Sequence, residues 1–345
     1  LPSAAPLLLV WFFSPEVARR ISRLDARKER QTLTPRSNQT LRHYARRTWL
    51  FFETFVGPGT HWLPPDHFQE QPKRRVAQRT SPTNIGMLLS SQLVAYDLGY
   101  LGRAGLATWA SNTLDALEQL ETHRGHIYNW YDTESLEPLA PRYVSTVDSG
   151  NLAGSLLALA EGCKAAAGDP SLRPQQFGGL KDVAELLAES VDRWAEGLSD
   201  EQAGRVRQLS DEFVGLFRDG AEANAELFQE AQSVVDELET SVVEAVKTVD
   251  SVHRDSVLLR ELKIWLDRST NQLAEALQNS ETTRHSQRLL EVAERARMLA
   301  ERMDFRFLYD EDRRFFSVGY NVSDDQRDPH HYDLLASEAR LASFL

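Results

Sequence analysis

The sequence lacks several features that would point directly to a function. Its 345 residues include one cysteine, Cys163, so no disulfide can form within the chain, and a reducing compartment suits it. Its formal net charge is −12 at pH 7, which argues against a dominant role in nucleic-acid binding, because phosphate backbones require basic surfaces. The chain has no G-x-S-x-G elbow, P-loop or G-x-G-x-x-G segment, and this removes the commonest hydrolase and nucleotide-binding interpretations.

A long hydrophobic run is also missing, because a membrane-spanning helix needs about 20 apolar residues. The run from Pro6 to Ser14 is shorter, and basic residues follow it within 19–23, which is not the order of a cleavable signal peptide. Two interpretations remain open for residues 1–35. In the first, these residues are the trailing edge of a transmembrane helix, with the arginines that follow it on the cytoplasmic side. In the second, they form an ordinary amphipathic helix. We expect a membrane-proximal segment.

Most of the chain shows the periodicity of amphipathic helices. The pattern predicts helices over residues 36–56, 83–101, 104–121 and 149–167. Only a few residues separate the second helix from the third, so these two should be antiparallel neighbours. Residues 176–303 are almost wholly helical in pattern, with Glu, Arg and Gln on the exposed faces. We interpret them as a helical insert or a continuation of the fold, without chemistry of its own.

A weak internal repeat connects two distant parts of the chain. Residues 127–139 contain two short extended runs around the turn signal DTES, and FRFLYDEDRRFFSVGYNV contains two aromatic-rich strands around a charged turn. Tyr131–Asp132 and Tyr309–Asp310 occupy the same place in each copy. Both copies run helix, hairpin, acidic loop and helix, which suggests a ring of α-hairpins with a site at its mouth. The expected parts are therefore a membrane-proximal segment (1–35), the first part of the ring (36–175), the insert or continuation (176–303), and a hairpin and helix that continue the ring (304–345).

Aromatic and acidic side chains are crowded into the loop HIYNWYDTESLEPLAPRYVSTVD, in front of an apolar helix. A saccharide site needs flat apolar faces that stack on pyranose rings, and carboxylates that bind hydroxyls or act on the glycosidic bond. Tyr128, Trp130 and Tyr143 are stacking candidates, and Asp132 and Asp148 are hydrogen-bonding candidates. The full set that we expect to contact substrate is Arg79, Asn84, Trp130, Tyr131, Asp132, Tyr143, Asp148, Asn151, Tyr309, Tyr320, Tyr332 and Asp333.

Each of these candidates also has a purely structural interpretation, which remains open. Asp148 stands at a helix start, where it can cap free N–H groups, and Asp132 stands at a turn, where Asp is favoured. Trp130 can belong to the core. In RTSPTNIG, Ser81 or Thr83 can cap the next helix with proline in its first turn. Alternatively, the polar residues of this stretch face the mouth of the ring.

Glu338 is the candidate catalytic residue. It follows the aromatic and histidine-rich loop HHYD and lies one turn from an apolar stripe of Leu334, Leu335, Leu341 and Phe344. A charge beside a buried face is costly unless it is paired or functional, so an ion pair with Arg340 or Arg79 is the structural alternative. No metal is expected, because the adjacent His330 and His331 cannot both face one ion on a regular element and no third ligand is obvious.

Several long strings, in order along the chain, resemble the cyclic β-1,2-glucan synthases of bacteria. They are TSPTNIG, GHIYNWYDTESLEPLAPRYVSTVDSGNLAGSLLAL, FLYDEDRRFFSVGYNV and YDLLASEARLASF. The synthases of this family are very large inner-membrane proteins with a membrane-embedded glycosyltransferase, a central glucoamylase-like domain and a phosphorylase-like C-terminal region. The resemblance covers most of residues 36–345 and corresponds to the start of the central domain.

The resemblance implies an all-α fold, an incomplete (α/α)6 toroid with small β-hairpins and a helical insert. It also implies a retaining transglycosylation that closes linear β-1,2-glucan into a ring, with Glu338 as acid/base and the second carboxylate beyond residue 345. An endo-β-1,2-glucanase and a non-catalytic structural module of a membrane glucan synthase are the alternatives. The expected partners are a β-1,2-glucan oligosaccharide and the remainder of a large synthase at the bacterial inner membrane, with this part cytoplasmic. No cofactor is implied.

Overall fold

The computed structural model describes residues 12–14, 16, 33–169, 173–218, 224–254, 256–277 and 282–331. The chain divides into two compact units, residues 1–41 and 42–345. Helix α2 (Pro35–Phe55) begins in the first unit and continues into the second. No helix among the described residues is long and apolar enough to cross a bilayer. Most of the predicted membrane-proximal segment lies outside the described residues, so its nature stays a prediction.

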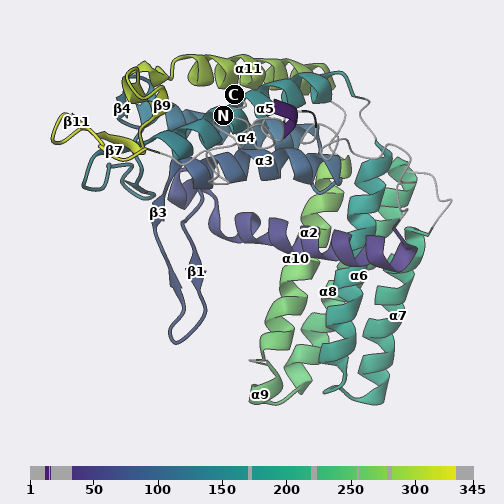
Figure 1. Ribbon diagram of the computed structural model, residues 1–345. Coiled ribbons are helices and arrows are strands. Elements are labelled where there is room, and N and C mark those ends of the chain that lie inside the picture. Colours follow the sequence, from purple (N-terminus) through teal and green to yellow (C-terminus); the bar gives the residue numbers. More distant parts are fainter. Residues whose placement is uncertain are drawn as a thin grey trace. The chain divides into compact units, whose positions relative to one another are not determined.

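The described helices of the second unit form two packed groups (Figure 1). The first group contains α3 (Pro82–Asp97), α4 (Arg103–Gln119), α5 (Thr146–Ala167) and α11 (Thr282–Glu301). The second group, called the helical bundle below, contains α6 (Pro174–Ala195), α7 (Asp200–Leu216), α8 (Ala225–Thr248) and α10 (Val257–Leu277). A short helix, α9 (Ser251–Arg254), and two 3-10 turns, η2 (Pro58–Thr60) and η3 (Phe305–Leu308), lie in the connections.

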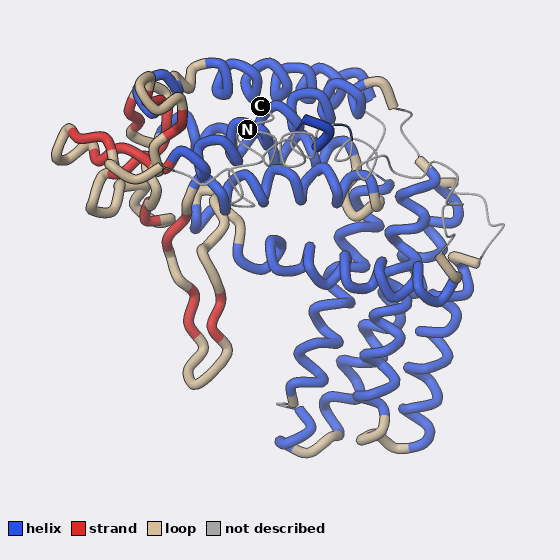
Figure 2. Tube along the Cα trace, in the orientation of Figure 1, coloured by secondary structure: helices blue, strands red, loops and turns tan. Residues whose placement is uncertain are grey.

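The strands are short antiparallel segments within the loops (Figure 2). Near the start of the second unit, β1 (Phe68–Gln69) and β2 (Arg75–Val76) form a local hairpin. A second local hairpin, of β4 (Thr122–His123) and β5 (His126–Ile127), follows α4. The hairpin of β8 (Tyr309–Asp310) and β9 (Phe315–Phe316) follows η3. Two further pairings join distant segments: β3 (Arg79–Thr80) with β6 (Tyr131–Asp132), and β7 (Tyr143–Ser145) with β10 (Gly319–Asn321), which also pairs with β11 (Gln326–Arg327).

Local signals in the sequence explain where the two helices nearest the candidate residues begin. The Ser81 hydroxyl accepts a hydrogen bond from the Asn84 N–H, and Pro82 occupies the first turn of α3, as the capping interpretation predicts. At the start of α5 the cap is Ser145, whose hydroxyl accepts from the Asp148 N–H at 3.3 Å. The side chain of Asp148 is therefore free to bond elsewhere, and the interpretation of Asp148 as the cap is wrong.

Each helix group has its own apolar core. The first core joins α3, α4, α5 and α11 with the hairpins that carry Tyr131 and Val144, and the second lies inside the helical bundle. A smaller cluster packs α2 on α3 through Trp49, Phe52 and Leu88. The predicted class, a mainly helical fold with small antiparallel hairpins and a helical insert, is confirmed, and the helix pairs fit an incomplete α/α toroid.

The extent of the bundle differs from the sequence pattern, which groups residues 176–303 together. Helix α11 packs against α5 and α4, and its buried Leu289, Val292 and Ala296 belong to the first core. The reason is that an apolar stripe shows that a helix is buried on one side but does not identify the core that covers it. The division of the chain into functional domains stays a prediction.

Candidate functional site

Residues from two separate segments meet at the pairing of β3 with β6. The register places Arg79 opposite Asp132, and the guanidinium carbon of Arg79 lies 4.5 Å from the ring centroid of Trp130, within the range of a cation–π contact. Beside them is a cavity of about 590 Å³. It is lined by His67, Gln69, Arg75, Val76, Ala77, Gln78, Arg79 and Asp132.

The carboxylate of Asp66 connects this pair of strands to helix α3. Its Oδ2 accepts from Arg79 Nη2 at 3.0 Å and Nε at 3.2 Å, and its Oδ1 accepts from Asn84 Nδ2 at 3.4 Å. His67 Nδ1 lies 3.1 Å from Oδ2. Although partial burial opposes it, these hydrogen bonds and the charge of Arg79 hold the pKa of Asp66 below its ordinary value. The sequence gives no signal for Asp66, because an aspartate after two prolines looks like an ordinary loop residue.

The first turns of α3 and α5 meet through three polar side chains. The Thr83 hydroxyl donates to Asp148 Oδ1 at 2.6 Å, and Asn151 Nδ2 donates to the Thr83 hydroxyl at 3.2 Å. Asn84, next to Thr83, is the residue that bonds to Asp66. Six of the predicted residues thus lie in one continuous set of contacts: Arg79, Asn84, Trp130, Asp132, Asp148 and Asn151.

The turn interpretation of Asp132 is confirmed, and Asp310 shows the same arrangement. Asp132 Oδ1 accepts from the backbone N–H groups of residues 134 and 135, at 2.9 and 2.8 Å. Asp310 Oδ1 accepts from those of residues 312 and 313, both at 3.1 Å. In each case the hydrogen bond to the second of these N–H groups is the main reason that the pKa of the carboxylate is lowered. The two hairpins of the internal repeat therefore share one turn geometry.

Tyr131 is not a substrate contact in this structure, which corrects the prediction. Its side chain is 0% exposed, its hydroxyl donates to the Glu121 carbonyl, and it accepts from the Tyr128 N–H at 2.7 Å. Burial raises the pKa of the Tyr131 phenol. Successive side chains of a strand point to opposite faces, so Tyr131 on β6 points into the core while Asp132 points outward. Tyr128, the other buried stacking candidate, lies in the same core.

The remaining tyrosines lie on the other set of strands. Tyr143 is opposite Asn321 in the pairing of β7 with β10, and its hydroxyl donates to Asp328 at 3.1 Å. Tyr320 stacks on His123 with centroids 5.6 Å apart, and its hydroxyl donates to Asp325 at 2.6 Å. The pairing of β7 with β10 joins two segments that lie far apart in the chain.

Tyr309 lies on β8, beside these strands. Arg327 of β11 donates to the Tyr309 carbonyl at 2.8 Å and to Asp310 Oδ2 at 3.3 Å. The N–H of Asn129, next to Trp130, donates to the Tyr143 carbonyl at 2.8 Å, which links the tyrosine strands to the cavity residues. Tyr332, Asp333 and Glu338 lie outside the described residues, so their assigned roles stay predictions.

The cavity is lined by two arginines, two glutamines and the Asp132 carboxylate, and Trp130 lies against Arg79 beside it. Such hydrogen-bonding groups next to an aromatic face suit a carbohydrate ligand. A comparison with known proteins finds a similar curated protein whose name describes a glucan synthase. The chain is 38% identical over 350 residues to the "Cyclic beta-(1,2)-glucan synthase NdvB" of Rhizobium meliloti (strain 1021), so the resemblance predicted from the sequence is confirmed. The match covers 98% of this chain, and the chain spans 12% of the length of that relative.

Two further comparisons add little. No protein-family model matches the chain. A crystal structure of a provisionally assigned glucoamylase from Bacteroides fragilis NCTC 9343 is similar with a TM-score of 0.33 and 15% sequence identity, over 59% of this chain and 52% of that one. A likeness at this level carries no argument about fold or activity.

Proposed function

We propose that this chain is part of a carbohydrate-active enzyme that acts on β-1,2-glucan. The observation that carries the proposal is the 38% identity to NdvB across 98% of the chain. The chain spans 12% of that relative, so the activity is proposed for the complete protein that contains it. From the resemblance alone, we also propose that the complete protein lies at a bacterial inner membrane with this part on the cytoplasmic side.

The proposed reaction is a retaining transglycosylation that closes linear β-1,2-glucan into a ring. Retention requires two carboxyl groups about 5 Å apart, one as nucleophile and one as acid/base. Water has to be excluded so that a sugar hydroxyl acts as the acceptor. We assign the acid/base role to Glu338, and we expect the nucleophile beyond residue 345.

Three carboxylates at or near the candidate residues would bind and orient the sugar rather than donate a proton to it. Asp66, Asp132 and Asp310 all have a lowered pKa, so they stay ionised at neutral pH, whereas a general acid needs a pKa near the working pH. Burial raises the pKa of Asp182 and Glu275. Both are enclosed by helices and already bonded, Asp182 to Arg42 and Glu275 to two backbone N–H groups.

The products formed from long linear β-1,2-glucan separate the three candidate functions. Incubation with the complete protein should yield cyclic glucan if it is a transglycosylase, and new reducing ends without cyclic product if it is an endo-β-1,2-glucanase. Absence of both products would favour a non-catalytic structural module. The Glu338→Gln variant should abolish processing, while Glu244→Gln on the exposed face of α8 should leave it unchanged. Unchanged processing by Glu338→Gln would contradict the catalytic assignment.

A further inference from the structure

Asp66 bonds to a residue of the cavity wall but does not itself belong to that wall. Its side chain is 20% exposed, and Arg79, not Asp66, belongs to the cavity lining. The backbone N–H of Asp66 donates to the Ala77 carbonyl at 3.2 Å, so the carboxylate is fixed relative to the segment that leads into β3. A ligand in the cavity would therefore meet Arg79 first.

The contact between Asp66 and Arg79 determines where the guanidinium lies. Two nitrogens of Arg79 bond to the same carboxylate oxygen, at 3.0 and 3.2 Å, and the guanidinium carbon lies 4.5 Å from the Trp130 centroid. The Arg79 side chain is 47% exposed, so without the carboxylate it would have many alternative rotamers. Asp66 thus confines a half-exposed arginine to one position above an aromatic ring.

This position leaves donors of Arg79 available to a ligand. A guanidinium has five N–H donors, Asp66 accepts two of them, and the other three form no hydrogen bond to the described residues. One face of Trp130 is covered by the guanidinium, so a sugar ring would stack on the uncovered part of the indole while its hydroxyls accept from Arg79. Arg79 and Trp130 together would then read the orientation of the ring.

We infer that Asp66 is a positioning residue for the sugar site: it holds Arg79 over Trp130 so that Arg79 can donate to sugar hydroxyls in the adjoining cavity. The inference rests on the proposed function, because it takes a saccharide as the ligand. It adds a residue that does not touch the ligand and that acts through Arg79.

A double-mutant cycle in the complete protein tests the inference. The variants are Asp66→Asn, Arg79→Ala and the double variant, with Asp211→Asn on the exposed face of α7 as the matched control. Linear β-1,2-glucan is the probe. Its Kd is measured by calorimetry, and its KM is measured by steady-state kinetics. Each single variant should weaken binding by about tenfold, as loss of a charge-assisted hydrogen bond does, mainly in KM. The double variant should bind as weakly as Arg79→Ala alone, and Asp66→Glu should restore part of the affinity.

Fluorescence of the ligand-free protein provides a readout that does not depend on a ligand. The emission of Trp130, obtained by subtracting the spectrum of Trp130→Phe in each background, should change in Asp66→Asn in the same direction as in Arg79→Ala. Additive losses in the cycle, or unchanged Trp130 emission in Asp66→Asn, would overturn the positioning role. Unchanged glucan binding by Arg79→Ala would overturn the sugar site at Arg79 and with it this inference. A lack of glucan binding by the unaltered complete protein would overturn the proposed function instead, so the two failures are distinguishable.

Discussion

The helical bundle and the hairpin layer, meaning the paired strands β3–β6, β7–β10–β11 and β8–β9, are stabilised in different ways. The bundle encloses large apolar side chains such as Trp194, Phe213, Phe228 and Trp265, all 0% exposed. The hairpin layer has strands of two or three residues, which form few ladder hydrogen bonds, and carboxylates such as Asp132 fix its turns. Burial therefore maintains the bundle, whereas the layer that carries the candidate site combines a few buried side chains, such as Tyr131 and Val144, with polar contacts that fix its turns.

Substitutions in the bundle should affect stability, whereas substitutions in the hairpin layer should affect ligand binding. Apolar burial in the bundle is spread over many side chains, and each large one contributes a few kcal/mol. In the hairpin layer a polar side chain has a few specific partners that determine a local geometry, which is typical of loops that carry function on a stable scaffold. The following variants separate the two cases, beginning with the largest expected effect.

Trp265→Ala should cause the largest loss of stability. Trp265 is fully buried in the bundle core, and its ring also lies 5.3 Å from the guanidinium carbon of Arg46. Truncation of a buried aromatic costs about 3–5 kcal/mol through lost burial and the cavity left behind. Urea denaturation followed by circular dichroism measures the loss in the free energy of unfolding. The control is Ile264→Ala, because the neighbouring Ile264 is 40% exposed. Equal losses for the two variants would contradict the description of the bundle core.

Glu275→Ala should cause the next largest loss of stability, because it removes a contact that joins the bundle to the first helix group. Glu275 Oε1, on α10, accepts from the N–H groups of Gly102 and Gly105 at the start of α4, both at 2.8 Å. Glu275→Ala leaves the N–H of buried Gly102 and that of half-buried Gly105 without this acceptor, and a buried donor without a partner costs about 1–3 kcal/mol. Glu275→Gln keeps an acceptor and should cost less. Denaturation of both variants checks this order, and a larger loss for Glu275→Gln would contradict the capping role.

Sequence patterns predicted the helices and hairpins well because periodicity and capping residues act locally. The helix predicted over 83–101 is observed as α3 at Pro82–Asp97, with Ser81 as its cap, and the Asp310 turn joins two strands as predicted. The cap of α5 was missed because Ser145 and Asp148 are both good capping residues. Only the observed contacts show that Asp148 bonds to Thr83.

The candidate site was predicted in part. Residues on two segments, such as Arg79 and Asp132, were expected at one rim and are brought together by strand pairing. Tyr131 was misassigned because the short strand gives no alternation from which its inward direction could be read. Asp66 was missed because its role depends on a contact with Arg79, 13 residues later in the chain, which no local pattern encodes.

Trp130→Ala should weaken glucan binding with little loss of stability. The ring is half-buried beside the cavity and contacts Arg79, so its removal eliminates a stacking surface outside both main cores. We expect about tenfold weaker binding, or 1.4 kcal/mol, measured by calorimetry with linear β-1,2-glucan. Phe315→Ala, an exposed aromatic of the hairpin layer outside the predicted set, is the control. A loss of stability as large as that of Trp265→Ala would place Trp130 in the core instead.

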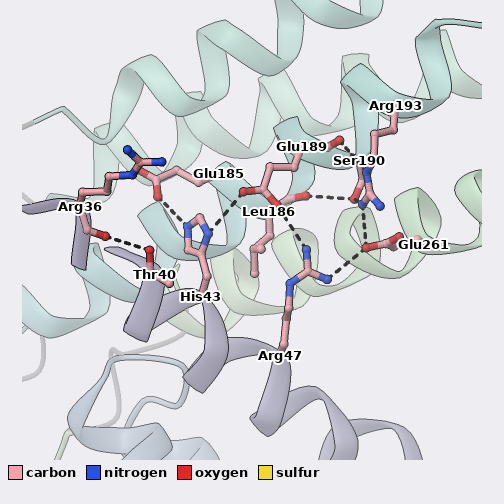
Figure 3. Close-up of polar contacts among 10 residues, drawn as sticks. All are labelled: Arg36, Thr40, His43, Arg47, Glu185, Leu186, Glu189, Ser190, Arg193 and Glu261. Carbon is pink, nitrogen blue, oxygen red and sulfur yellow. Dashed lines mark hydrogen bonds and ion pairs between the residues drawn. The ribbon is translucent and has the colours of Figure 1, made fainter. Parts of the chain in front are cut away.

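The smallest expected effect is a pH dependence at the contact between α2 and the bundle, shown in Figure 3. His43 bonds to Glu185 at 2.8 Å and lies 3.4 Å from Glu189, and the hydrogen bond to Glu185 is the main reason that the pKa of His43 is raised above 6.5. Because the pKa of His43 is raised in the folded state, protonated His43 contributes stability that is fully present below pH 6.5. This contribution is lost as the pH rises through the folded pKa.

We expect a fall of about 1 kcal/mol or less in the free energy of unfolding, because such partly exposed ion pairs are weak. Urea denaturation at a series of pH values, from below pH 6.5 upward through the folded pKa, measures this fall. His43→Gln and Glu185→Gln should each flatten the dependence of the unfolding free energy on pH. An unfolding free energy that rises with pH in the native protein, and flattens in both variants, would show that the pair favours neutral His43 instead.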